Sequence, residues 1–151
     1  QFLGERRSSL FRIRMTTPEA LALSNEANAL FVDEDYDSAL DLYMQAIEIA
    51  PQSADLLVAR AAVYLKMEDY PAAIGDTNKA IQLDAGNAKA YFRRGCAWLA
   101  LNEADKAEAD LKKAQEITPE DAAVKKEIAK VAALRKKLKD QEKGFAKKMF
   151  G

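Results

Sequence analysis

A 34-residue period runs through this 151-residue chain and constrains its fold more than any other feature. Small residues recur at this interval in three copies. They are Ala20, Ala54 and Ala88; Ala27, Ala61 and Gly95; Ala39, Ala73 and Ala107; and Ala46, Ala80 and Ala114. Each set lies in an amphipathic helical pattern, where small side chains let two helices approach closely. A period of roughly 20–50 residues indicates stacked units, so we expect an all-α array of helical hairpins.

Capping residues and breaks divide the chain into three hairpins. Thr17 and Pro18 are suited to begin the first helix, because a threonine side chain caps free amides and proline needs no amide donor there. Asp35 and Ser53 are the expected caps of the next two helices. The expected repeats span residues 20–53, 54–87 and 88–121, within a domain of residues 17–121. Three repeats are about the minimum for a stable stack.

The segment 122–151 has no internal turn and predicts one basic helix of roughly 30 residues. Its first half carries an apolar stripe of Val124, Ile128, Val131 and Leu134. Such a stripe can cap the last repeat, as the end of a solenoid requires. In the second half, lysines surround Phe145, Met149 and Phe150. This half has three candidate partners: a second copy of the chain, calmodulin and an acidic membrane surface. The alternative is a helix end that is simply exposed to solvent.

Charge is segregated along the chain, although the net charge is only −1. Residues 1–14 carry +3; residues 15–121 carry nine basic and twenty acidic side chains, giving −11; residues 122–151 carry ten and three, giving +7. Acidic repeats repel phosphates, so we expect no nucleic-acid partner. Apolar runs fall short of the roughly 20 residues of a membrane span, so none is expected.

The residue types argue against catalysis. The chain has no histidine, which removes the commonest general base and metal ligand. Its single cysteine, Cys96, cannot form an internal disulfide and is expected to be inert packing. The sequence shows no glycine-rich phosphate loop and no nucleophile elbow. We therefore expect no enzyme activity, no metal and no cofactor.

Residues 1–16 show neither a helical nor a strand period, and they lack the apolar stretch of a secretory signal. We expect a flexible leader or a tail added for expression, with Met15 as the native start. Their arginine and serine content makes a remnant of an organelle transit peptide the alternative. The expected location is the cytoplasm, with the nucleus as a second candidate.

Three runs, residues 35–40, 78–84 and 88–95, resemble the tetratricopeptide domains of co-chaperones. The resemblance implies three helix-turn-helix repeats stacked as a right-handed superhelix, with a long C-terminal capping helix. The repeats look most like SGT-type co-chaperones, which link heat-shock protein 90 to ubiquitin ligases. The C-terminal helix looks like the closing helix of tetratricopeptide immunophilins. The implied partner is therefore a protein or peptide: a chaperone, a client or a ubiquitin-ligase subunit.

In this family the first helices of the repeats line a concave face that holds an extended peptide. The resemblance places these residues on or near it: Ser24, Asn25, Asn28, Ala59, Ala62, Lys66, Lys89, Phe92, Arg93 and Cys96. Chaperone-binding relatives grip C-terminal carboxylates with a clamp of Lys, Asn, Asn, Lys and Arg. Asn28, Lys89 and Arg93 match that clamp, whereas Ser24 replaces the first Lys and Ala59 replaces the second Asn.

Two functions follow from this partial match. In the first, the chain is an adaptor that binds a partner without the full clamp. Each charge-assisted hydrogen bond is worth roughly 1.5–3 kcal/mol, so losing two weakens carboxylate binding at least about a hundredfold. In the second, the clamp still works because Asn25 or Arg60 compensates, as in chaperone-binding immunophilins.

Overall fold

The computed structural model describes residues 17–151, so the leader expected over residues 1–16 lies outside the described residues. The described part is built from helices. They are α2 (Pro18–Val32), α3 (Tyr36–Ile49), α4 (Ala54–Lys66), α5 (Tyr70–Leu83), α6 (Ala88–Ala100), α7 (Ala104–Ile117) and α8 (Ala122–Phe150). The expected all-α fold and the long C-terminal helix are both confirmed.

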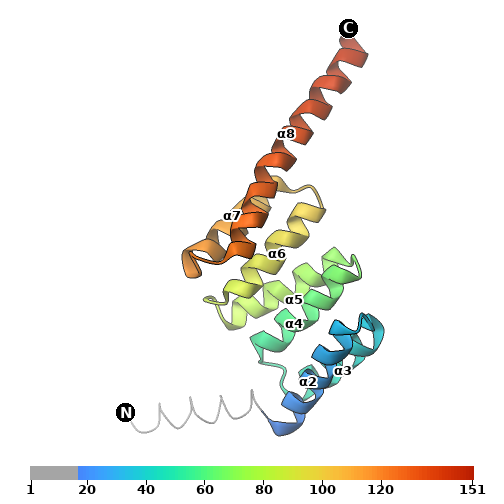
Figure 1. Ribbon diagram of the computed structural model, residues 1–151, viewed down its shortest axis with the longest axis vertical. Helices are drawn as coiled ribbons and strands as arrows, with labels where there is room; N and C mark the ends of the chain where they lie inside the picture. The colour runs from blue at the N-terminus through green and yellow to red at the C-terminus, as the bar shows by residue number, and fades with distance from the viewer. Residues whose placement is uncertain (1–16) are drawn as a thin grey trace.

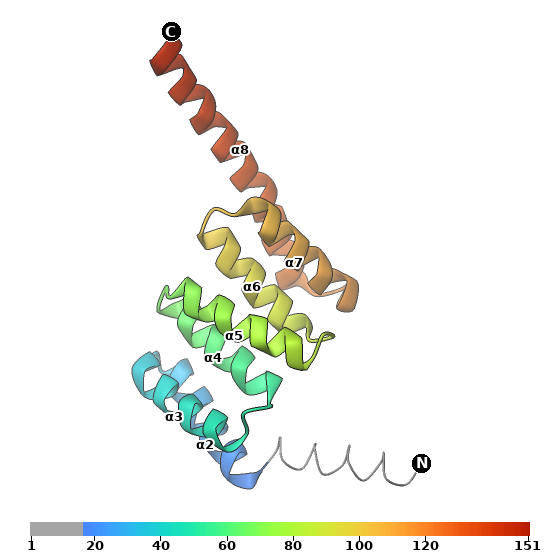
Figure 2. The ribbon, with the colours of Figure 1, turned by 180° about the vertical axis from the view of Figure 1, so that it is seen from behind.

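The helices form three hairpins, α2–α3, α4–α5 and α6–α7, which stack into the expected superhelix. Figure 1 shows one layer in front, made of α2, α4, α6 and the first half of α8. The opposite view in Figure 2 shows α3, α5 and α7 in front. Helix α3 contacts α4, α5 contacts α6, and α7 contacts α8, so packing is continuous from the first repeat to the C-terminal helix.

Polar side chains at the helix starts satisfy backbone amides that have no partner within the helix. The three expected caps are confirmed: Thr17 accepts from the Ala20 amide at 3.2 Å, Asp35 from the Ser38 amide at 3.2 Å, and Ser53 from the Leu56 amide at 3.4 Å. Asp69, Asn87 and Asp121 cap later helices in the same way. Glu103, which precedes α7, makes no side-chain cap bond. Local sequence therefore defines most of the helix starts.

One turn geometry joins the two helices of every repeat. Glu34, Glu68 and Asn102 occupy the left-handed region with φ of 62°, 60° and 61°, and they are spaced by the 34-residue period. The residue after each one donates its amide to a carbonyl five residues back, at 2.9 Å in all three repeats. This closure satisfies a free helix-end carbonyl and fixes how the second helix leaves the first.

The periodic small residues, apart from Ala88, are buried in the stack. Ala27 and Ala61 are 0% exposed, and Gly95 occupies the same register in α6. A β-carbon at Gly95 would lie 2.8 Å from Cγ of Leu111, so α6 and α7 have no room for even a methyl group there. The interval seen in the sequence is therefore a packing requirement.

The first half of α8 covers the end of the stack, as the sequence predicted. Val131 is buried in a cluster with Ala107 and Leu111, and Ile128 and Leu134 pack against that cluster. Arg135 binds Asp105 at 2.7 Å and also contacts Glu108. The Arg135 guanidinium, together with Lys112, lowers the pKa of Glu108 to about 2. Residues 139–151 are exposed. None of the described helices carries an apolar stretch that could cross a membrane.

Candidate peptide-binding face

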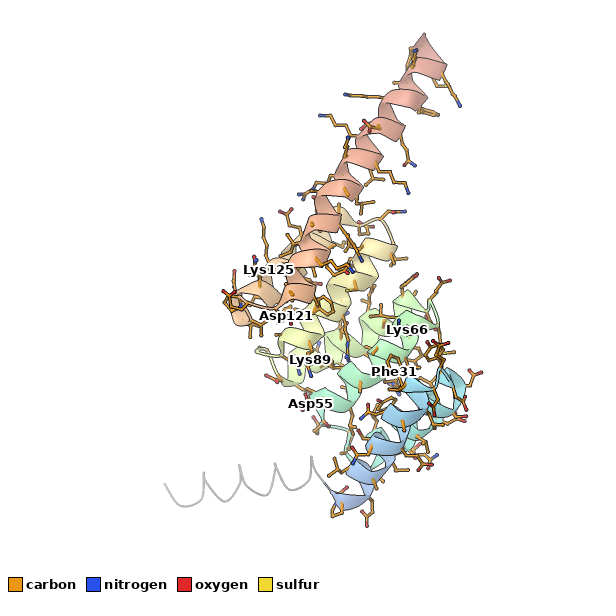
Figure 3. The ribbon with its side chains drawn as sticks, in the orientation of Figure 1. Phe31, Asp55, Lys66, Lys89, Asp121 and Lys125 are labelled. Carbon is orange, nitrogen blue, oxygen red and sulfur yellow. The ribbon has the colours of Figure 1, made fainter. Side chains whose placement is uncertain are left out.

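We call the exposed surface of α2, α4 and α6 the first-helix face. The sequence-predicted site residues all come from these three helices. Asn25, Asn28, Lys66 and Lys89 are exposed, while Ser24, Ala59, Ala62, Phe92 and Arg93 are half-buried. Figure 3 shows Lys89 near the start of α6 and Lys66 near the far end of α4, so the two lysines mark opposite ends of the face.

Asn28 is oriented by a tyrosine from the second helix of its own repeat. The Tyr43 hydroxyl donates a hydrogen bond to Oδ1 of Asn28. Burial raises the pKa of Tyr43, so its phenol stays protonated and keeps this donor role at neutral pH. Because the amide oxygen of Asn28 is already used, its two N–H donors remain for a partner's carboxylate.

Arg93 is a half-buried cation without a carboxylate partner among residues 17–151. Its Nη1 donates to the carbonyl oxygen of Val58 in α4, which holds the side chain across the gap between two repeats. Burial lowers the pKa of Arg93, although an arginine remains charged at neutral pH. A desolvated guanidinium with unused donors favours an incoming anion.

The other two arginines of the repeats are each paired with a carboxylate inside the fold. Arg60 forms a two-pronged pair with Asp76 at 2.7 Å for both contacts, and Arg94 forms the same pair with Asp110 at 2.7 Å for both. These hydrogen bonds raise the pKa of Arg60 and of Arg94. Because Asp76 already neutralises Arg60, this arginine is less suited than Arg93 to the compensating role that the working-clamp hypothesis gives it.

The two departures from the clamp leave positions that carry no charge. Ser24 offers only a hydroxyl, and Ala59 packs against the buried cluster of Ala27, Ala39, Tyr43 and Val63. Phe92 also contributes to the core, because it packs against the buried cluster that includes Leu111 and Val131. Three of the five clamp positions, Asn28, Lys89 and Arg93, keep a group that can bind a carboxylate.

An open hollow of about 490 Å³ lies near the far ends of α4 and α6, beside α8. Its lining includes Leu65, Lys66, Tyr70, Cys96, Leu99, Glu127 and Lys130. Burial raises the pKa of the Cys96 thiol to about 12, so the thiol stays protonated and is a poor nucleophile at neutral pH. Among residues 17–151, no group of three acidic or cysteine side chains is placed to hold a metal ion.

Glu127 and Lys130 were not among the sequence-predicted residues of this face. They form an ion pair at 2.6 Å on the side of α8 that borders the hollow. A signal was present, because Glu127 lies one 34-residue period after Arg93, and Lys130 lies one period after Cys96. Helix α8 thus extends the first-helix face as the first helix of a further repeat would.

Family models described as tetratricopeptide repeat match residues 20–53 and 88–121, and a second such model matches residues 42–75. The chain belongs to the tetratricopeptide repeat family. Proteins with these repeats form interaction surfaces from stacked helix pairs. The matches reach all three hairpins, cover the first and third, and leave residues 76–87, which include most of α5, unmatched.

Curated relatives match part of this tetratricopeptide repeat chain. A rice protein described as an SGT1 homolog is 43% identical over 53 residues, which are 35% of this chain and 14% of that protein. The heat-shock protein cognate co-chaperone sgt12 of Aspergillus fumigatus is 46% identical over 48 residues, 32% of this chain and 14% of that protein. The matched part therefore spans about a seventh of each relative's length.

Solved structures match most of the tetratricopeptide repeat fold. The first such domain of RPAP3, bound to the HSP90 peptide SRMEEVD, has a TM-score of 0.75 and 30% identity, over 80% of this chain and 96% of that chain. The Sgt2 domain from Aspergillus fumigatus has a TM-score of 0.77 and 28% identity, over 86% and 85%. The TPR2B domain of yeast Sti1, in complex with an Hsp70 peptide, has a TM-score of 0.71 and 29% identity, over 76% and 97%.

Proposed function

We propose that this chain is a non-catalytic, co-chaperone-type adaptor domain that binds the C-terminal segment of a protein partner on its first-helix face with an incomplete carboxylate clamp. The observation that carries the proposal is Arg93, a half-buried cation that no acidic side chain of the described fold neutralises. Lys89 and the free amide donors of Asn28 lie on the same face. Together they suit a peptide that ends in carboxylates.

Heat-shock protein 90 and heat-shock protein 70 are the partners best supported by similarity. Structural neighbours at about 30% identity are bound to peptides of these chaperones. In this chain Ser24 and Ala59 cannot supply two of the five clamp contacts. We therefore propose that a chaperone peptide binds weakly, and that contacts outside the clamp add to the affinity.

Isothermal titration calorimetry tests this proposal with the peptides SRMEEVD and SGPTIEEVD. We expect dissociation constants no tighter than about 100 μM, equivalent to about 5–6 kcal/mol of binding free energy. Lys89→Ala is the matching variant, and Lys79→Ala on α5 is its control, because Lys79 lies outside the first-helix face. Tight binding that Lys89→Ala abolishes would overturn the incomplete-clamp proposal.

A working clamp is the second candidate, and the free donors of Arg93 and Asn28 favour it. The double variant Ser24→Lys, Ala59→Asn separates the two candidates. An incomplete clamp predicts that peptide affinity rises at least about a hundredfold when both contacts are restored. A working clamp predicts little gain, because the existing contacts already saturate the peptide's carboxylates.

The likeness to SGT-type proteins supports a finer proposal, in which this domain connects a chaperone to clients or to a ubiquitin-ligase complex. An affinity pull-down with the intact chain tests it. Reversing Lys89 and Arg93 to Glu should remove chaperone or ligase subunits from the captured proteins. Reversing Lys79 and Lys113, which lie on second helices, should leave them. Capture that survives reversal of Lys89 and Arg93 would place the partner on another surface.

A further inference from the structure

Opposite charges are gathered at opposite ends of this molecule. Residues 17–59 contain no lysine or arginine. Their acidic residues are Glu19, Glu26, Asp33, Glu34, Asp35, Asp37, Asp41, Glu48 and Asp55. Within residues 17–151 every ion pair lies at Arg60 or beyond, so these carboxylates have no cationic partner in the described fold. Figure 1 shows α2 and α3 at one end of the molecule and the protruding part of α8 at the other.

The outer side of α3 concentrates this acidic charge around an exposed methionine. Asp37, Asp41, Met44 and Glu48 follow one another at steps of four, three and four residues, so they share one face of the helix. All four are exposed, and Met44 keeps 45% of its surface accessible. We call this face the acidic edge. It offers carboxylates on either side of an apolar contact point.

The free half of α8, residues 136–150, has the complementary chemistry. It contains six lysines against Asp140 and Glu142. Val124, Val131, Leu138 and Phe145 form one stripe at steps of seven residues. The first two are buried against the stack, whereas Phe145 is 65% exposed and nearby Met149 is 62% exposed. The stripe that docks the first half of α8 thus continues along the free half, where no other helix of residues 17–151 covers it.

The docked half of α8 shows how such a helix binds this fold. Its apolar stripe packs beside α7, while Arg135 binds Asp105 at 2.7 Å. Asp37 lies two 34-residue periods before Asp105. The acidic edge therefore carries a carboxylate at the repeat position where Asp105 binds Arg135 of α8. Pairing two free halves with each other would bring like charges together, which disfavours that arrangement.

We propose that the free half of α8 from one copy docks on the acidic edge of a second copy. Lysines of the free half meet Asp37, Asp41 and Glu48, and Phe145 and Met149 contact Met44. Each copy carries both surfaces, so the contact joins different patches of the two copies. It leads either to a closed pair or to a growing chain, and both have a mass above 16.7 kDa.

Sedimentation velocity of the full chain tests this association. Near 0.1 M salt the Debye length is about 10 Å, so charges on two copies still attract each other. Under these conditions we expect the weight-average mass to rise above 16.7 kDa as the protein concentration increases. Near 1 M salt, where the Debye length is about 3 Å, the mass should return toward one copy. A mass that stays at 16.7 kDa at every concentration and salt level would overturn the proposal.

Charge reversal identifies the two surfaces. The tail variant carries Lys143→Glu and Lys147→Glu, and the edge variant carries Asp41→Lys and Glu48→Lys. We expect each double variant alone to remain a single copy. An equal mixture of the two should associate again. Lys79→Glu with Lys113→Glu is the control that should behave as the unmodified chain. Circular dichroism checks that all variants stay helical. Association of the tail variant alone, for example through arginines of residues 1–14, contradicts the proposal, as does a mixture that stays monomeric.

Discussion

Repeats two and three use ion pairs to join their helices, and repeat one does not. Arg60–Asp76 and Arg94–Asp110 occupy equivalent positions one period apart. In repeat one these positions hold Glu26 and Leu42, and the Tyr43–Asn28 hydrogen bond joins the helices at a different register.

All three repeats nevertheless share the same left-handed turn, and each has a small residue, Ala27, Ala61 or Gly95, at the same position of its first helix. The comparison indicates that the small residues and the turns determine the fold. The polar contacts between the two helices of a repeat can therefore differ from one repeat to the next. That freedom leaves acids of repeat one, and Lys89 and Arg93 of repeat three, without an ion-pair partner among residues 17–151. The two binding surfaces that we propose are built from this difference.

The largest effect is expected where an ion pair is broken in repeat three. Asp110→Ala leaves the Arg94 guanidinium, which is 22% exposed, without its carboxylate. We expect the free energy of unfolding to fall by about 3 kcal/mol, near the lower end for buried pairs. Urea denaturation followed by circular dichroism measures the change.

Asp41→Ala in repeat one is the matched control for that variant. Asp41 is exposed and makes no ion pair in the described fold, so its removal should change stability by less than about 0.5 kcal/mol. Equal losses for Asp41→Ala and Asp110→Ala would show that the repeats do not differ as we describe.

A smaller effect is expected at the shared turn. Glu34 and Glu68 adopt a left-handed conformation that costs an L-residue roughly 1–2 kcal/mol, and glycine avoids this cost. We expect Glu68→Gly and Glu34→Gly each to raise the free energy of unfolding by about 1 kcal/mol. Asn102→Gly should gain less, because asparagine tolerates this conformation. Equal gains in all three repeats, measured by urea denaturation, would contradict this ordering.

The smallest effect is expected at the start of α7. Asp35 and Asp69 cap the second helices of repeats one and two, whereas Glu103 makes no cap bond in repeat three. We expect Glu103→Asp to supply the missing bond and raise stability by about 0.5 kcal/mol. Thermal unfolding is sensitive enough to detect it, and Asp35→Glu should give the reverse change. No shift for either variant would mean that these caps are energetically neutral.

Much of the fold was predictable from the sequence because its causes are local or periodic. The repeated alanines and Gly95 predicted the contacts within the hairpins. Thr17, Asp35 and Ser53 predicted where helices start. The length of the C-terminal helix followed from the lack of any break after residue 122. Each of these signals is carried by residues that act within one or two turns of helix or at a fixed interval.

The binding face was only partly predictable, because the role of an arginine depends on its partner. Arg93 and Arg94 are neighbours in sequence, yet one contacts a carbonyl of α4 and the other is held by Asp110. The 16-residue spacing that Arg94–Asp110 shares with Arg60–Asp76 was the available signal. Phe92 was assigned to the face, but its ring also packs beneath α8, which depends on a helix 30 residues away.

The most direct test compares Arg93 with Arg94 in the double variant Ser24→Lys, Ala59→Asn, in which we expect peptide binding to be strong enough to measure. Calorimetry with SRMEEVD and urea denaturation are done on the same proteins. We predict that Arg93→Ala lowers peptide affinity at least about tenfold and changes stability little, because its guanidinium serves the partner. Arg94→Ala should lower stability by about 3 kcal/mol and leave affinity unchanged. Unchanged affinity in Arg93→Ala would contradict the proposed role of this face.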